Sequence, residues 1–280
     1  MPTKKTTCIP RLITLLYAII AIALISLHLG CDSNAINKKT YPEKDVAPAI
    51  TALCKKEYDI DVKVEMIGNT LWVYAPVVNM LNKENMIDEA IHKKIGNIYL
   101  NIERVVLSTD KRIDFFVLVV SDVKAGIDFV TLGHTLDMKK FMVSYISRDD
   151  FFDRLIRSAT PSPLAINDTE GRHINRFDIK LSDFVTNQLL DRLRQKFSDT
   201  SKYDISYLNA LYEDGILKIA YNIKPKGAGD IKENVDREIL DIAALVFKNY
   251  EFKEFLALEL DNMATHSNSV HTYIELRKLS

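Results

Sequence analysis

Glycine, proline and cysteine are scarce in this chain of 280 residues, which has nine Gly, eight Pro and three Cys. Few Gly and Pro exclude a low-complexity or collagen-like chain, and no Gly-rich phosphate-binding loop is present. Three cysteines, Cys8, Cys31 and Cys54, cannot form a disulfide framework. We interpret Cys54 as a small buried side chain on the apolar face of a helix.

An excess of either charge is also missing. The formal net charge is −1, and the 27% of charged residues mix both signs. General nucleic-acid binding needs a basic face, so we expect no nucleic-acid partner. The 47% hydrophobic content excludes a disordered chain. About 250 residues follow the first thirty, enough for two modules of roughly 100 residues or one large domain.

Motifs of known enzyme classes are absent as well. The sequence has no GxSxG or HExxH pattern, and the closest histidines, His266 and His271, are five residues apart. That spacing does not place two imidazoles on one face of a helix, as a metal site of the HExxH kind requires. We therefore predict no catalytic residue, no metal ligand and no cofactor, and the sequence names neither a substrate nor a reaction.

One long apolar run stands at the N-terminus. Lys4, Lys5 and Arg11 precede the uncharged stretch from Leu12 to Leu29. Basic residues stay in the cytoplasm while the apolar segment inserts, so this pattern is typical of an export signal or membrane anchor. We predict that residues 1–30 are a signal peptide or anchor and that the rest is extracytoplasmic.

Gly30 and Cys31 close this run. The junction resembles the signal of bacterial lipoproteins, which are cut before a cysteine that carries the lipid. The resemblance implies that Cys31 is the lipid attachment site. An uncleaved anchor is the alternative, because the apolar run approaches the roughly 20 residues that span a bilayer, and a soluble secreted product is a third. Residues 31–43 are polar and predict a short tether.

The body of the chain alternates helix and strand patterns. Residues 44–135 predict a first module in the order αββαββ, with a period of two in the strands and of three to four in the helices. Its predicted elements are a helix from Asp45, strands at 60–66 and 70–77, a helix at 87–105, and strands at 113–120 and 127–132. Trp72 and Tyr74 project from one face of a strand, either into a core or as a recognition surface.

Residues 181–280 predict the same order again. A helix after Ser182, a hairpin around Gly215, a helix at 235–250 and strands at 255–260 and 270–279 follow one another. We interpret this as an internal duplication; a coincidence within a generic α+β chain is the alternative. The predicted fold is α+β: two tandem αββαββ modules, each with two helices on a mainly antiparallel four-stranded sheet.

Residues 136–180 predict a connector between the modules. Ser147 caps a short helix at 148–157, and the prolines at 161 and 163 end it. We expect residues 158–178 to be a surface loop or hinge, with a segment that packs between the modules as the alternative.

These patterns predict a membrane-anchored lipoprotein on the extracytoplasmic face of the cell envelope, most simply a non-catalytic scaffold or protein-binding protein. In topology alone it resembles the inner-ring lipoproteins of secretion systems, with their ring-building motifs, which implies self-association. Its expected partners are the membrane, through the lipid or an N-terminal helix, and an envelope protein or a second copy. The alternative is a small-ligand-binding or hydrolytic lipoprotein with a pocket between the modules.

Overall fold

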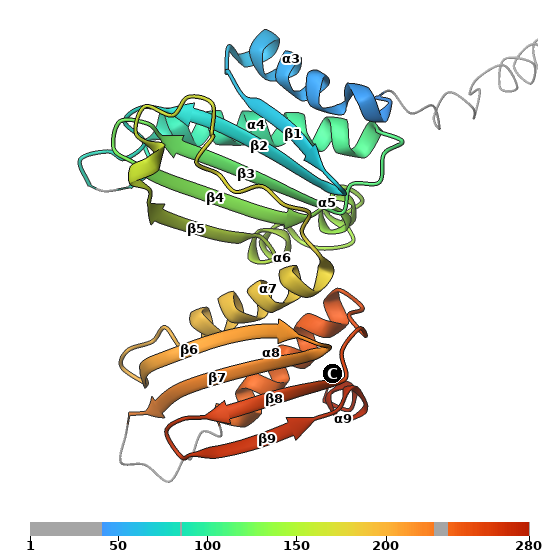
Figure 1. Cartoon of the computed structure of the whole chain (residues 1–280), viewed down its shortest axis with the longest axis vertical. Helices are drawn as coiled ribbons and strands as arrows, with labels where there is room; N and C mark the ends of the chain where they lie inside the picture. Colours follow the sequence, from blue (N-terminus) through green and yellow to red (C-terminus); the bar gives the residue numbers. More distant parts are fainter. Residues whose placement is uncertain (1–40, 85, 227–234, 280) are drawn as a thin grey trace, which may run out of the picture.

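The computed structural model describes residues 41–84, 86–226 and 235–279, and it is an α+β fold with two mostly antiparallel sheets (Figure 1). Residues 1–30, Cys31 and the tether up to residue 40 lie outside the described residues. Within the described ranges, no helix is both long enough and apolar enough to cross a membrane.

The first sheet has five strands in the order β1-β2-β3-β4-β5, and only β2 and β3 run parallel. A parallel pair needs a crossover, which α4 supplies. The elements are α3 (Val46–Tyr58), β1 (Lys63–Ile67), β2 (Thr70–Val77), α4 (Glu89–Ser108), β3 (Phe115–Asp122), β4 (Ile127–His134), α5 (Thr135–Met142), α6 (Arg148–Asp153) and β5 (Ile156–Pro161).

Helices α3 and α4 cover one face of this sheet. Asp88 caps α4 by accepting a hydrogen bond of 2.9 Å from the N–H of Ala90, and Ile98 and Ile102 on the apolar stripe are buried. Cys54 lies fully buried in the same core, which confirms its interpretation as a buried side chain.

The second sheet has four strands in the order β6-β7-β8-β9, and again only the middle pair is parallel. Its crossover is α8. The elements are α7 (Leu181–Lys196), β6 (Tyr203–Glu213), β7 (Ile216–Pro225), α8 (Val235–Asn249), β8 (Ala257–Asn262), β9 (Ser267–His271) and α9 (Tyr273–Arg277).

The connector differs from the sequence-based expectation. Strand β5 pairs with β4, so the first sheet has five strands instead of four, and the expected loop from residue 158 is wrong as far as Pro161. The β5 sequence carries no clear alternation of apolar residues, and the open edge of β4 provides its hydrogen bonds. Helix α6 begins as predicted: Ser147 caps it through a 3.0 Å bond from the N–H of Asp150. Its predicted end at residue 157 is wrong, because the helix ends at Asp153 and Ile156–Pro161 form β5.

The C-terminal strand is shorter than expected. A strand over 270–279 is wrong beyond His271, because Thr272 and Glu275 form a capping box that starts α9. The Thr272 hydroxyl accepts from the N–H of Glu275, and the Glu275 carboxylate accepts from the N–H of Thr272. Leu276 of this helix is then buried in the core.

Helix α7 lies between the two sheets, as Figure 1 shows. Phe184 of α7 packs against Phe115 of the first sheet, with ring centroids 5.2 Å apart, and against Tyr250 after α8, at 5.1 Å. Trp72 and Tyr74 belong to the same buried cluster as the apolar residues of the second sheet. Their prediction as core residues is confirmed, and both sheets share one hydrophobic layer.

Candidate functional site

Residues 162–180, called the strap below, cross the face of the first sheet that α3 and α4 leave uncovered (yellow in Figure 1). The strap is held along its length. Asn167 donates its N–H to the carbonyl of Val123 at 2.8 Å, and the Trp72 indole donates to the carbonyl of Phe177 at 2.9 Å. The expected hinge between the modules is therefore a segment fastened to the first sheet.

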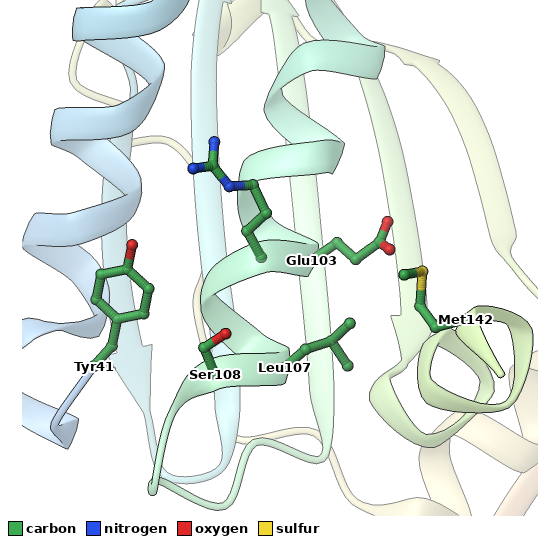
Figure 2. Close-up of a pocket in the computed structure, with 6 residues that line it drawn as sticks. Tyr41, Glu103, Leu107, Ser108 and Met142 are labelled. Carbon is green, nitrogen blue, oxygen red and sulfur yellow. The ribbon is translucent and has the colours of Figure 1, made fainter. Parts of the chain in front are cut away.

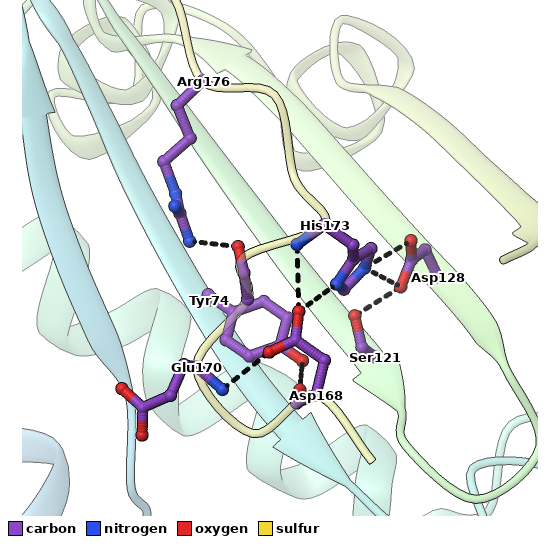
Figure 3. A network of polar contacts seen from close by, with 8 residues as sticks. Tyr74, Ser121, Asp128, Asp168, Glu170, His173 and Arg176 are labelled. Atoms are coloured by element: carbon purple, nitrogen blue, oxygen red, sulfur yellow. Dashed lines mark hydrogen bonds and ion pairs between the residues drawn. The ribbon is translucent and has the colours of Figure 1, made fainter. Parts of the chain in front are cut away.

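His173 is the centre of a polar cluster under the strap (Figure 3). Its Nδ1 lies 2.6 Å from Oδ2 of Asp168, and its Nε2 lies 3.1 Å from Oδ2 of Asp128 on β4. The ring therefore bridges two carboxylates, one from the strap and one from the sheet.

Two hydroxyl groups complete the cluster. Ser121 of β3 donates to the Asp128 carboxylate, and Tyr74 of β2 donates to the backbone carbonyl of Asp168. Arg176 donates to the carbonyl of Gly171 at 2.8 Å, which closes the strap turn. Gly171 has a φ of +68°, and a Cβ there would lie 2.6 Å from the Tyr74 ring, so this turn needs glycine.

The Asp168 carboxylate is stabilised in its charged form. Burial alone would raise its pKa, but hydrogen bonds from the His173 ring and from the N–H groups of His173 and Glu170 outweigh burial and lower the pKa to about 2. The charged carboxylate is therefore part of the folded state at neutral pH.

This cluster contains Ser, His and Asp side chains, as the catalytic triad of a hydrolase does, but they are arranged differently. In a Ser–His–Asp triad the imidazole takes the proton of the serine. Here the Asp128 carboxylate stands between Ser121 and His173, and the side chains of His173 and Asp128 are only 5% and 9% exposed. The side chains of Asp168, His173 and Asp128, called the latch below, instead hold the strap against the sheet.

Asp178 fastens the end of the strap. Its Oδ1 accepts from the N–H of Asn69 at 2.9 Å and from the Thr70 hydroxyl at 3.2 Å. An ion pair with Lys180 and the bond from Asn69 lower the pKa of Asp178. Gly68 allows this approach, because a Cβ on it would lie 2.4 Å from the Asp178 carboxyl carbon.

A pocket of about 310 Å³ lies where the described chain begins (Figure 2). Its lining comes from Tyr41, the C-terminal end of α4 and Met142 of α5. Within it, burial raises the pKa of Glu103, whereas Arg104 is paired with Glu57 at 2.7 Å. The volume is at the lower end of ligand-binding sites.

A second pocket of about 310 Å³ lies between α8 and α9, and Phe247, Lys248 and Tyr273 are among its lining residues. Each pocket is formed by elements of one sheet and its helices. Neither lies between the two sheets, where the sequence analysis placed its alternative ligand site.

His266 and His271, the closest pair of histidines in the sequence, both lie on the β8–β9 hairpin. His266 has a φ of +55° in the β8–β9 turn, and the His271 ring bonds to Ser269 at 3.0 Å. Residues 41–84, 86–226 and 235–279 contain no group of three or more His, Cys, Asp or Glu arranged to hold a metal. Cys31 lies outside these ranges.

Sequence reasoning missed the latch. Asp168 and His173 are five residues apart in a polar stretch with Gly171, a pattern typical of a turn, but nothing in the sequence pairs them with Asp128, 45 residues from His173. Comparisons of the chain with protein-family models, with curated proteins and with solved structures find no match.

Proposed function

We propose that this chain is a membrane-tethered, extracytoplasmic and non-catalytic protein that binds an envelope protein or a second copy of itself. The observation that carries the proposal is the latch. The His173, Asp168 and Asp128 side chains are largely buried between the strap and the sheet. Their hydrogen bonds hold the strap in place. The N-terminal pattern of basic residues, apolar run and Gly30-Cys31 supports the tether.

The second sheet offers a binding surface. Helices α7 and α8 pack on the face that carries Leu217 and Ile219, and the opposite face exposes Tyr207, Leu211 and Val270. In the first sheet the corresponding face is covered by the strap and α7. An open sheet face with tyrosine and aliphatic side chains is suited to protein contacts.

The tandem arrangement is part of this proposal. Two copies of one αββαββ unit account for the repeated pairing pattern, in which an antiparallel hairpin, a parallel crossover and a second antiparallel hairpin follow one another. In this proposal the first copy then acquired β5 and the strap. Helix α7 packs on the face of its sheet that carries Trp72 and Phe115.

Attachment is tested by the intact mass of the protein extracted from membranes. The proposal expects a chain that begins at Cys31 with added lipid, or an intact leader. Cys31→Ala should abolish the lipid mass. A chain that is cytosolic, unlipidated and free of membranes would overturn the tether.

Partner binding is tested by crosslinking on intact membranes. We expect the wild-type chain to crosslink to one defined envelope protein or to itself, and Tyr207→Asp with Leu211→Asp to abolish that product. Leu245→Asp on α8 is the control, because Leu245 is 48% exposed and Leu211 is 51% exposed. A strictly monomeric chain with no crosslinked product would contradict the binding role.

A further inference from the structure

The end of α5 presents a group of exposed apolar side chains, called the α5 patch below. It consists of Met142, Val143 and Tyr145. Val143 and Tyr145 are each 76% exposed, and the turn between them contains Ser144 at a φ of +56°. Single exposed apolar residues are common, but three within four positions at the tip of a turn form a patch that water solvates poorly.

Basic residues stand beside the patch. Lys139 and Lys140 occupy the last turn of α5, and in the part of the chain that the structure describes neither forms an ion pair. Arg148 lies over the Phe152 ring at 5.5 Å. Apolar side chains at a tip with lysines around them match the composition of segments that insert into a lipid interface. Asp149 and Asp150 offset part of the positive charge of these residues. The affinity for a lipid surface therefore comes mainly from insertion of the apolar side chains.

The patch lies where the chain leaves the folded body. Tyr41, the first described residue, and Met142 line the same pocket from opposite sides of the α4 end (Figure 2). The N–H of Tyr41 donates to the carbonyl of Ser108 at 3.2 Å, which fixes this exit point. Nine residues, 32–40, lie between Cys31 and Tyr41, and this stretch of chain spans at most about 35 Å when extended.

Such a short tether keeps the patch close to the bilayer. Linking two binding events in one chain gives the second an effective concentration in the millimolar range, so a small apolar patch is sufficient. Tyrosine suits the interface, because its ring is apolar and its hydroxyl remains hydrated.

We propose that Met142, Val143 and Tyr145 insert into the lipid surface to which the chain is tethered, so that the body lies against the membrane with the α5 end facing the lipid. This inference rests on the proposed tether and adds the orientation of the body. The open face of the second sheet, which forms the lower half of the molecule in Figure 1, stays available to a partner.

The test uses the full chain reconstituted in vesicles of phosphatidylcholine and phosphatidylglycerol, with or without bromine on the acyl chains. Tyr145→Trp is placed in a Trp72→Phe background, so that it is the single tryptophan. We expect its fluorescence to be quenched by the brominated lipid. Leu256→Trp, at the position before β8, is 74% exposed against 76% for Tyr145; it is the matched control and should not be quenched.

A second variant separates insertion from mere proximity. Adding Val143→Asp to the Tyr145→Trp chain should remove the quenching, while circular dichroism stays unchanged because Val143 makes no core contact. If the chain floats with the vesicles but Tyr145→Trp is quenched no more than Leu256→Trp, docking is overturned and the tether stands. A chain that does not float overturns both. A blue shift that depends on protein concentration and not on lipid would assign the patch to a second copy and overturn lipid docking.

Discussion

Asp137 and Arg154 form a buried ion pair where the two sheets meet. The Asp137 Oδ1 and Arg154 Nη1 are 3.0 Å apart, and their side chains are 2% and 12% exposed. A second Arg154 nitrogen donates to Asn249 at the end of α8 at 3.3 Å. Arg154, which directly follows α6, thus joins α5 to the end of α8.

We predict that Asp137→Ala lowers the free energy of unfolding by about 3–5 kcal/mol, because it leaves the Arg154 charge buried without its partner. Denaturant titration measures the effect. Arg112→Ala is the control: Arg112 is 79% exposed and pairs with Asp114 at the surface, so its loss should cost less than about 1 kcal/mol. Equal effects for the two variants would contradict the role of burial.

Asp168 makes the latch sensitive to acid. Its pKa is about 2 in the folded state and about 3.9 in an unfolded chain. The unfolded chain therefore binds a proton more readily, and the stabilisation is complete above about pH 4 and is lost as the pH falls towards 2. The contribution is on the order of 2 kcal/mol.

Asp168→Asn should accordingly weaken the protein at neutral pH and flatten the loss of stability between pH 4 and 2, measured by denaturant titration across that range. Some pH dependence will remain, because the pKa of Asp178 is lowered as well. Asp110→Asn, at an exposed position after α4, should keep the wild-type pH profile. An unchanged slope in Asp168→Asn would rule out the latch as its source.

At the scale of elements, the strap replaces the layer that a second pair of helices would form on the first sheet. It is irregular, so its stability depends on side-chain bonds to the sheet: those of His173, of Asp178 and of the Trp72 indole. Segments held by a few such bonds open before the rest of a fold.

Trp72, the only tryptophan, reports on this opening because its indole bonds to Phe177 of the strap. We predict that in His173→Ala the Trp72 emission shifts to the red at a lower denaturant concentration than the far-ultraviolet circular dichroism changes. In the wild type the two transitions should lie closer together. His92→Ala, on the exposed side of α4, should behave as the wild type, and coincident transitions in His173→Ala would refute the prediction.

At the scale of the whole molecule, the two sheets share a core. The buried cluster that includes Trp72 and Phe115 of the first sheet continues through Phe184 of α7 to Leu217 and Leu258 of the second. A shared layer of this kind couples the folding of its two sides, unlike two modules on a flexible linker.

We predict a single calorimetric transition for the body, and a loss of about 3–5 kcal/mol for Phe184→Ala, which removes a fully buried ring between the sheets. Phe151→Ala, in the core under α3 and α4, should lower the same single transition. Two transitions, of which each variant shifts only one, would show that the modules unfold independently.

Much of the local structure follows from sequence alone. The periodicity at 87–105 predicts α4, the Gly215 turn predicts the β6–β7 hairpin, and Ser147 caps α6 as its position predicts. Each of these signals acts over a few residues. The spacing of Thr272 and Glu275 is also a local pattern, typical of a capping box, although the apolar alternation around it indicated a strand.

The tertiary structure decided the rest. Strand β5 forms because the edge of β4 has backbone groups free to pair with it. The strap lies against the sheet because the Trp72 and Tyr74 side chains donate hydrogen bonds to its backbone carbonyls. His173 finds Asp128 across 45 residues, and Asp178 finds Asn69 across 109. Local patterns encode periods and caps, whereas a bond between distant residues depends on which faces the fold brings together. Only the folded chain shows that His173 joins Asp168 of the strap to Asp128 of the sheet.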